Sequence, residues 1–415
     1  MTDSAISLSA RAPWVLALDA GSSSVRAGLY DAVGRPLEGG PVARFRVAWR
    51  TSPEGAMEAD GEALLAACAA AVDGAMEVAG RAGIEVAAVA VATFWHGVMG
   101  VGADGRPATP LYGWGDTRAR EDAARLRGRV DAGAAHGRTG CFVHEVYPAA
   151  KLVWLRRTLG DTFPRVAAWG SLGELLALRL FGARRTSVSM ASGTGLLDVR
   201  ALRWDAEMMA AAGVEEGTLP EVSDAPLVGL LPEYARRWPG LAGVPWVPAL
   251  GDGACASLGS GARGGRVALT VGTSAAVRVL RAEADPPVPP GLWCYRLDAR
   301  RAVWGRALSN AGNVHAWLRR TLRLPEGEEL DRALASAEAR GHGLLVWPEL
   351  VGERPPLEAG PGAEVRGLTL ATTPVQIARA WLEAAAVGMA EALDAVEAAF
   401  GPADEVVAGG GALHA

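Results

Sequence analysis

Two short loops in this sequence combine glycine with hydroxyl residues in a way that can bind phosphate. The first is Gly21-Ser-Ser-Ser24 and the second is Gly272-Thr-Ser274. Backbone N–H groups and hydroxyls in tight glycine turns present partial positive charge to phosphate oxygens. Asp19 ends the apolar run before the first loop, where a carboxylate can hold Mg²⁺ or its water shell. Together the loops predict a polyphosphate site.

A second candidate for chemistry is Asp252, which lies between two glycines directly after the apolar residues 244–250. A carboxylate at the end of a strand can project into a cleft and take a proton from an attacking hydroxyl. Taken alone, an aspartate in Gly-Asp-Gly is more often a turn residue or helix N-cap without any catalytic role. The residue types alone leave both interpretations open.

Aromatic and polar residues occur together in Phe94-Trp-His-Gly97 and in Trp114-Gly-Asp-Thr-Arg118. A polyhydroxylated ligand requires a flat apolar wall with hydrogen-bond donors and acceptors at its rim. Trp95, His96 and Asp116 meet that requirement, although each also fits a packed core aromatic or a helix cap.

Several other chemistries lack the residues that they need. Lys151 is the only lysine, so no glycine-rich loop has the sequence G-x-x-x-x-G-K-[ST]. No Ser-His-Asp elbow and no His-x-x-x-His pair supports a hydrolase or a metalloprotease. The cysteines are far apart, which favours free thiols over disulfides or a zinc site: Cys68, Cys141, Cys255 and Cys294.

The composition is that of a globular enzyme. Of the 415 residues 50% are hydrophobic and 21% are charged, and the formal net charge is -5, which excludes a disordered tail and a polycationic nucleic-acid binder. The length predicts two or three domains. The longest apolar runs, residues 63–72 and 86–95, are about half as long as a bilayer crossing requires. We therefore expect a cytoplasmic protein that binds neither membrane nor nucleic acid.

The elements that must position these residues alternate between strands and helices, which indicates an α/β architecture. Strand-like residues flank the first loop, and no helix follows it directly, as a dinucleotide-binding fold would require. Residues 267–274 resemble residues 16–23, which fits either a duplicated domain or two ordinary hairpins. The clearest helix begins at the capping box Thr373-Pro-Val-Gln376 and extends to about Phe400.

Taken in order, segments over nearly the entire chain resemble the motifs of the FGGY family of carbohydrate kinases. These segments are Asp19-Ala-Gly-Ser-Ser-Ser-Val-Arg26, Trp114-Gly-Asp-Thr-Arg118, Lys151-Leu-Val-Trp154, Gly251-Asp-Gly-Ala-Cys-Ala256, Val271-Gly-Thr-Ser274, Gly352-Glu-Arg-Pro355 and Gly409-Gly-Gly-Ala412. The resemblance implies a two-domain actin-like ATPase fold, which is ribonuclease H-like, with duplicated α/β domains around a cleft. The N-terminal domain would comprise residues 1–243 and the C-terminal domain residues 244–415.

The resemblance also implies a role for each matching residue. Asp252 would be the general base on the sugar hydroxyl, and Asp19 would help to hold Mg²⁺. The sugar would contact Trp95, His96, Asp116 and Asp252. ATP would contact Gly21, Ser22, Ser23, Arg26, Gly272, Thr273, Gly312, Gly409, Gly410, Gly411 and Ala412.

The activity implied by the resemblance is ATP-dependent phosphorylation of a hydroxyl of a small sugar, sugar acid or polyol. The segments around Trp95, Asp104 and Trp114 look most like gluconate-type members, and a ketopentose kinase for xylulose or ribulose is the alternative. Dimers are the commonest oligomers, so a homodimer is the default expectation.

Family members continue beyond the adenosine glycines, so the resemblance also suggests that the C-terminal domain is truncated and incomplete. An incomplete domain leaves open the alternative that the protein is a non-catalytic relative that senses sugar or nucleotide. An actin-like filament or chaperone would share the hairpins of the fold but not the Trp114 and Gly352 motifs.

Overall fold

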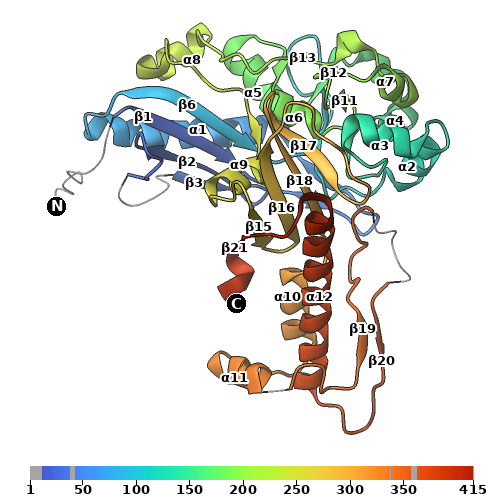
Figure 1. Ribbon diagram of the computed structural model, residues 1–415. Helices are drawn as coiled ribbons and strands as arrows, with labels where there is room; N and C mark the ends of the chain where they lie inside the picture. The colour runs from blue at the N-terminus through green and yellow to red at the C-terminus, as the bar shows by residue number, and fades with distance from the viewer. Residues whose placement is uncertain (1–11, 38–42, 337, 357–361, 415) are drawn as a thin grey trace. The chain divides into compact units, whose positions relative to one another are not determined.

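The computed structural model describes residues 12–37, 43–336, 338–356 and 362–414 (Figure 1). Its residue contacts divide the chain into two compact units. The first unit comprises Met1–Ala256, Glu283–Pro287 and Cys294–Ala302, and the second comprises Ser257–Ala282, Val288–Trp293 and Val303–Ala415.

This division lies downstream of the boundary expected between residues 243 and 244. The reason is the strand β14 (Leu250–Gly251), which pairs in parallel with β6 (Val86–Thr93) of the first unit. Residues after 243 thus complete the first sheet before the chain enters the second unit. Asp252, expected in the C-terminal domain, belongs by its contacts to the first unit.

The first unit is built on a five-stranded sheet with the strand order β14-β6-β1-β2-β3. Strands β1 (Trp14–Ala20) and β2 (Ser24–Tyr30) form an antiparallel hairpin, and β3 (Ala43–Arg46) pairs antiparallel with β2. β6 runs parallel to β1. Because β1, β6 and β14 are parallel, their carboxyl ends meet at one edge of the sheet.

Helix α1 (Gly61–Arg81) covers this sheet through contacts with β1, β2 and β3. The Asp60 carboxylate caps the helix by accepting hydrogen bonds from the N–H groups of its first turn. By length and composition alone, α1 is the one helix in the described ranges that could cross a membrane. In the structure it is a core helix, and Asp73 on it accepts hydrogen bonds from Arg237 and Trp238.

The rest of the first unit consists of shorter elements. Its further strands are β4 (Arg50–Thr51), β5 (Met57–Ala59), β7 (Met99–Val101), β8 (Leu111–Tyr112), β9 (Ala168–Gly170), β10 (Arg185–Thr186), β11 (Leu197–Asp198), β12 (Arg203–Trp204) and β13 (Glu221–Val222). Its further helices are α2 (Arg120–Arg127), α3 (Ala132–Thr139), α4 (Pro148–Leu159), α5 (Leu172–Phe181), α6 (Val188–Ser192), α7 (Ala206–Ala212) and α8 (Pro232–Arg237). Short 3₁₀ helices lie at Gly160–Arg165, Glu216–Thr218 and Pro239–Leu241. Helix α4 packs against α2 and α7 around an apolar core.

The second unit repeats the hairpin of the first. β15 (Arg266–Val271) and β16 (Ala275–Ala282) are antiparallel, and β21 (Glu405–Gly409) runs parallel to β15. β18 (Arg301–Leu308) lies on the other side of β16. Each hairpin therefore has a parallel strand beside its first strand, β6 in one unit and β21 in the other. This shared topology favours a duplicated domain over two unrelated hairpins.

The other elements of the second half are α9 (Asp252–Gly259), β17 (Trp293–Asp298), α10 (Gly312–Thr321), α11 (Glu328–Ser336), β19 (Leu345–Trp347), β20 (Glu364–Arg366), α12 (Pro374–Phe400) and a 3₁₀ turn at Gly411–His414. The predicted start of the long helix is confirmed. The Thr373 side chain accepts from the N–H of Gln376, and the Gln376 side chain accepts from the N–H of Thr373. Helix α12 packs against β16, α10 and β19.

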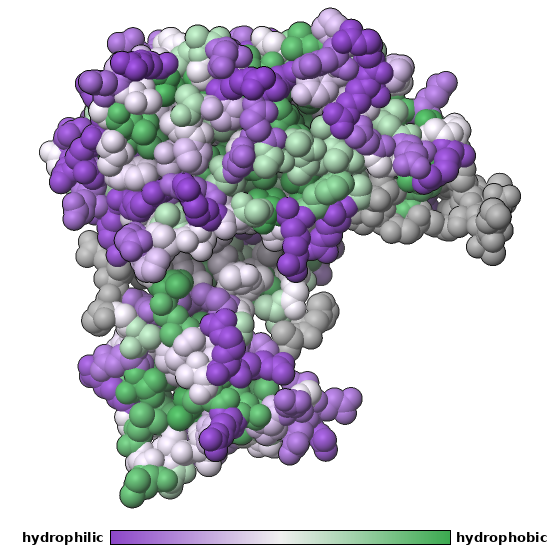
Figure 2. All heavy atoms as spheres, turned by 180° about the vertical axis from the view of Figure 1, so that it is seen from behind, coloured by the Kyte–Doolittle hydropathy of each residue, from purple (hydrophilic) through white to green (hydrophobic). Residues whose placement is uncertain are grey.

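The molecular surface is mainly hydrophilic on the face drawn in Figure 2, with hydrophobic side chains interspersed. Exposed large hydrophobic residues in the second unit include Leu345 and Trp347 of β19 together with Leu368 and Leu370. In the first unit they include Val33 and Val228.

Candidate active site

Three predicted site residues of the first unit lie at or just beyond the carboxyl ends of its parallel strands β1, β6 and β14. Asp19 is near the end of β1, Trp95 follows β6 and Asp252 follows β14. In the strand register Asp19 and Leu250 both pair with Ala92. Neighbouring strands are about 4.8 Å apart, so Asp19 and Asp252 extend from strands about 10 Å apart.

Asp19 forms an ion pair with Arg26, its direct partner across the hairpin, at 2.6 Å between Oδ2 and Nη2. Their side chains are 38% and 42% exposed, so the pair is accessible to a ligand. Between them the N–H of Gly21 donates to the Ser24 carbonyl at 3.1 Å, which closes the loop as a tight turn. In the structure, the predicted metal ligand Asp19 therefore lies next to the predicted phosphate-binding loop and Arg26.

The fit of this site to Mg²⁺ rests on Asp19. Within the described ranges, no group of three or more His, Cys, Asp or Glu side chains is placed to hold a metal ion. Nucleotide-binding proteins hold Mg²⁺ through one or two carboxylates together with substrate phosphates. A single half-exposed carboxylate beside a phosphate loop agrees with that pattern.

Asp252 is the first residue of α9, and its Oδ1 accepts from the N–H of Gly253 at 2.8 Å. The preceding strand is held because the N–H of Gly251 donates to Ser189 Oγ at 3.1 Å. The indole of Trp95 lies so close to Gly251 that a Cβ there would overlap the Trp95 ring. Glycine at position 251 is therefore required by the close approach of the indole, which packs against the residue directly before Asp252.

Cys255 lies on the first turn of α9, one turn after Asp252. Burial, with further contributions from Asp252 and Asp19, raises the pKa of the Cys255 thiol to about 12. All four cysteines are free, as the sequence predicted.

The predicted sugar residues Trp95 and His96 are held by backbone carbonyl groups. Trp95 Nε1 donates to the Ser189 carbonyl at 3.0 Å, and His96 Nδ1 donates to the Gly193 carbonyl at 2.7 Å. His96 has a φ of 66°, a left-handed conformation that is uncommon outside glycine. Such backbone strain occurs where the surrounding structure compensates for it, often at functional sites.

Two tyrosines that the sequence analysis did not identify complete this cluster. The Tyr147 ring lies 5.0 Å from His96, and the Tyr295 ring lies 4.9 Å from Trp95 and 5.4 Å from His96 between centroids. Tyr147 directly precedes the proline at the start of α4, which is a sequence signal for its place but not for its contact. Tyr295 has no local signal, because its contact depends on a distant segment joining the first unit.

Asp116 lies in a buried ion-pair network. Its side chain is 1% exposed, and its oxygens accept from the N–H of Met57 at 3.0 Å and from the Arg118 guanidinium at 2.6 Å. Arg118 also pairs with Glu58. Burial opposes the charged form of Glu58, but Arg50 and Arg118 lower the pKa of this carboxyl. These contacts give Asp116 a clear structural function, and its contact with sugar stays a prediction.

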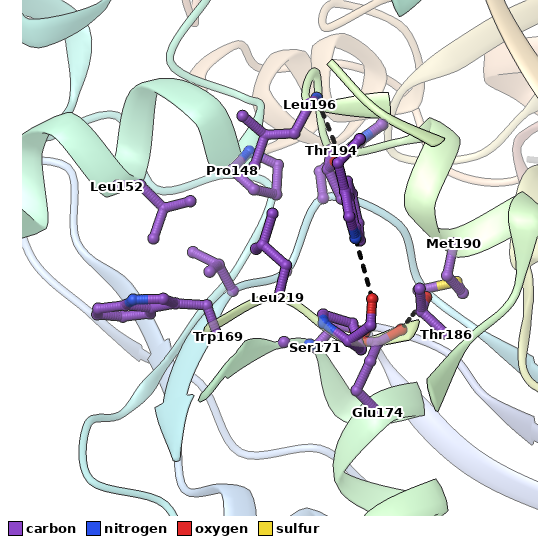
Figure 3. Close-up of a pocket in the computed structure, with 16 residues that line it drawn as sticks. Pro148, Leu152, Trp169, Ser171, Glu174, Thr186, Met190, Thr194, Leu196 and Leu219 are labelled. Atoms are coloured by element: carbon purple, nitrogen blue, oxygen red, sulfur yellow. Dashed lines mark hydrogen bonds between the residues drawn. The ribbon is translucent and has the colours of Figure 1, made fainter. Parts of the chain in front are cut away.

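A pocket of about 450 Å³ adjoins His96 (Figure 3). Its lining is mainly apolar and includes Pro148, Leu152, Trp169, Met190, Leu196 and Leu219. At its polar end Glu174 accepts from the N–H of Ser171 and from the Thr186 hydroxyl. The carboxylate of Glu174 therefore caps α5 and ties it to β10.

Lys151 is fully buried in α4, where its ammonium group donates to the carbonyls of Glu145 at 2.9 Å and Val146 at 2.5 Å. These bonds fix the chain directly before Tyr147. Burial lowers the pKa of Lys151 to about 7, against the opposing effect of the Asp116 and Glu145 carboxylates.

Lys151→Met should remove a pH dependence of stability. The unfolded chain binds a proton at Lys151 up to about pH 10.5, whereas the folded protein releases it near pH 7. The stability of the wild type relative to Lys151→Met should therefore rise between pH 7 and pH 10, at a slope approaching about 1.4 kcal/mol per pH unit, and stay flat below pH 6. Urea unfolding of both proteins at pH 5.5, 7, 8 and 9 measures this; a constant difference contradicts it.

In the second unit, predicted nucleotide residues from three separate segments converge. The N–H of Gly312 donates to the Gly272 carbonyl at 3.0 Å, and the N–H of Asn313 donates to the Thr273 carbonyl at 3.1 Å. A Cβ on Gly312 would overlap the Gly272 carbonyl and crowd Ala412. The β15–β16 loop, the start of α10 and the loop after β21 therefore lie together.

The loop after β21 has its own glycine requirement. Gly409 pairs in parallel with Thr270 at the end of β15. Gly410 has a φ of 113°, and a Cβ on it would overlap the Val271 carbonyl. Gly411 has open space around it. The backbone of this loop is thus determined chiefly at Gly410.

Glu353, from the Gly352-Glu-Arg-Pro355 motif, holds the chain that leads into α10. It is 8% exposed and accepts from the N–H of Ser309 at 2.6 Å and from Asn310 Nδ2 at 3.2 Å. Asn310 in turn exchanges hydrogen bonds with the backbone of Val351. The motif therefore positions the turn before Gly312.

Under the kinase activity that the sequence resemblance implies, Glu353→Gln should raise the KM for ATP about tenfold, because an amide NH₂ would face the donor on Asn310 and a charge-assisted bond to a buried group would be lost. The KM for sugar should stay unchanged, since Glu353 lies in the second unit. Initial-rate kinetics against each substrate measures both values. The exposed Glu326→Gln is the matched control, and an equal response of both variants would contradict the positioning role.

Comparison with protein-family models matches residues 14–259 to the N-terminal domain and residues 267–415 to the C-terminal domain of the FGGY family of carbohydrate kinases. The chain belongs to this family. The predicted family and its two-domain actin-like fold are confirmed.

Relatives of this FGGY chain include two kinds of sugar kinase. It is 27% identical over 337 residues to a gluconokinase of Bacillus subtilis (strain 168), covering 76% of this chain and 65% of the relative. It is 28% identical over 336 residues to a xylulose kinase of Escherichia coli (strain K12), covering 79% and 68%. The match thus spans less than two thirds of the gluconokinase.

Solved structures of sugar kinases share the fold of this chain. The crystal structure of gluconate kinase from Lactobacillus acidophilus superposes with a TM-score of 0.86 at 24% identity, covering 97% of this chain and 82% of the other. At that identity the similarity establishes the fold alone.

Proposed function

We propose that this FGGY chain is an ATP-dependent carbohydrate kinase that phosphorylates a hydroxyl of a small sugar or sugar acid. The observation that carries the proposal is that Asp252 follows Gly251, against which the Trp95 indole packs, at the same sheet edge as the Asp19–Arg26 pair. A carboxylate, an aromatic wall and a phosphate loop are the parts that phosphoryl transfer to a sugar requires.

In the proposed reaction the Asp252 carboxylate takes the proton of the sugar hydroxyl. The hydroxyl oxygen then bonds to the γ-phosphorus while the bond from that phosphorus to the β–γ bridging oxygen breaks, releasing ADP. Asp19 would hold Mg²⁺, which neutralises charge on the phosphates when bound. Trp95, His96 and Asp116 would orient the sugar.

We assign the remaining predicted residues to ATP. The loop Gly21-Ser22-Ser23 with Arg26 would bind phosphate oxygens from the first unit. The second unit would bind ATP through Gly272, Thr273, Gly312, Gly409, Gly410, Gly411 and Ala412. Their convergence within that unit supports this assignment.

Gluconate is the proposed substrate, and a ketopentose such as xylulose is the second candidate. The similarity to both a gluconokinase and a xylulose kinase supports testing the two together. A cytoplasmic location, a homodimer and a division of roles between residues 1–243 and 244–415 remain predictions.

The test is ADP release from ATP with gluconate, xylulose, ribulose, glycerol or no sugar, with and without Mg²⁺. Sugar-stimulated, Mg²⁺-dependent turnover is expected, and the preferred sugar identifies the substrate class. A folded protein that binds one of these sugars without turnover would instead support a sugar-sensing relative.

A further inference from the structure

A short segment from the second half of the sequence is built into the first unit. Residues Cys294–Ala302 belong to that unit by their contacts. The N–H of Cys294 donates to the Gly140 carbonyl at 2.9 Å. Gly140 has a φ of 69°, and a Cβ on it would overlap the Cys294 carbonyl. The backbone segments around Gly140 and Cys294 therefore lie in direct contact.

Arg296 anchors the other side of this segment. Its side chain is fully buried and donates to the carbonyls of Val199 at 2.7 Å, Glu283 at 2.7 Å and Ala284 at 2.6 Å. Its N–H donates to Ser192 Oγ at 2.9 Å. With anchors at Cys294 and Arg296, the residue between them has little freedom to move.

That residue is Tyr295, and its hydroxyl lies 2.7 Å from the hydroxyl of Tyr147. The distance is typical of a good O–H···O hydrogen bond. Tyr147 is 2% exposed and Tyr295 is 3% exposed, so the bond is shielded from water. Tyr147 is itself held by the bonds of Lys151 to the two preceding carbonyls.

The tyrosine rings enclose the residues proposed to bind sugar. Tyr147 and Tyr295 each meet the His96 ring nearly edge to face, at interplanar angles of 79° and 63°. Tyr295 also meets Trp95 at 61°. Edge-to-face pairs at these separations are attractive and depend on orientation. The backbone of His96 is in a left-handed conformation, which persists where the surrounding structure holds it.

We infer that the Tyr147–Tyr295 hydroxyl pair is a positioning device that holds His96 and Trp95 in the geometry that binds the sugar. The inference rests on the proposed kinase function for its consequence in sugar binding. Its structural part, the orientation of His96, can be tested without any sugar.

The experiment compares Tyr147→Phe, Tyr295→Phe and the double variant with the wild type. Each single variant keeps the ring and removes the hydroxyl bond. Tyr234→Phe is the matched control, because Tyr234 is buried in α8 of the same unit and packs on Trp238. The first readout is the NMR spectrum of ¹⁵N-histidine protein, with the His96 signals assigned from His96→Gln. The second readout compares the change in the KM for gluconate and for xylulose with the change in the KM for ATP.

We expect the His96 signals to move in both single variants and not in Tyr234→Phe. The KM for sugar should rise about tenfold in each, as for loss of one buried hydrogen bond, while the KM for ATP is unchanged. The double variant should resemble a single variant, because both changes remove the same bond.

Unchanged His96 signals in both single variants would overturn the inference, whatever the activity. Additive effects of the two changes on the KM for sugar would also overturn it. Moved His96 signals in a protein that phosphorylates no sugar would support the positioning device and reject the kinase proposal. If Tyr295→Phe does not fold, Tyr147→Phe removes the same bond.

Discussion

Asp252→Asn is expected to lower the rate of sugar phosphorylation by about 10²- to 10⁴-fold while sugar binding persists. The amide has nearly the same shape as the carboxylate, and its oxygen can still accept from the N–H of Gly253. It cannot take up the proton of the attacking hydroxyl, so the step that makes the nucleophile is lost. Single-turnover phosphorylation and calorimetric sugar binding measure the two properties separately.

The control for this prediction is Asp131→Asn. Asp131 is an exposed N-cap that accepts from the N–H of Ala134 at the start of α3, and asparagine caps helices as well as aspartate. If Asp252 were only a turn or cap residue, the two variants would behave alike and both would keep full activity. That result would remove Asp252 from the mechanism.

Gly410→Ala is expected to raise the Kd and KM for ATP by about 100-fold or more. Alanine at a φ of 113° is strained by about 1–3 kcal/mol, and its Cβ would overlap the Val271 carbonyl, which belongs to the sheet and cannot yield cheaply. The loop Gly409–Ala412 would have to move away from Gly312. Calorimetric titration with ATP measures the loss.

Gly259→Ala is the matched control, because Gly259 also lies in the second unit, nothing lies near a Cβ at that position, and it is not among the residues assigned to ATP. Its affinity for ATP should stay within about threefold of the wild type. Sugar binding in the first unit should be retained by both variants, which distinguishes loss of the nucleotide loop from general unfolding. Equal ATP affinity of the two variants would show that this loop does not contact the nucleotide.

Much of this molecule follows from local sequence patterns. Glycine-hydroxyl turns after Asp19 and after Val271 predicted two phosphate loops, and both are hairpin turns in the structure. The capping box at Thr373 predicted the start of α12, because its hydrogen bonds join residues three apart in the chain. The order of short motifs predicted the family, since each motif is read within a few residues.

Other features depend on contacts between distant residues, and the sequence analysis did not foresee them. Asp116 was expected at the sugar or at a helix cap, whereas the fold surrounds it with Arg118 and the backbone of Met57. Glu353 was identified as part of a motif, but the hydrogen bonds that it accepts from Ser309 and Asn310 are visible only in the structure.

The sequence by itself determined the family, the α/β class and the candidate residues at the end of each strand, because those properties are encoded over spans of a few residues. Only the tertiary structure decided that the Trp95 indole packs against Gly251 and that the Tyr295 ring contacts the His96 ring. These contacts are set by the register of parallel strands and by the path of Cys294–Ala302 into the first unit. No local preference of the chain encodes these two contacts, because each depends on burying side chains that come from distant parts of the sequence.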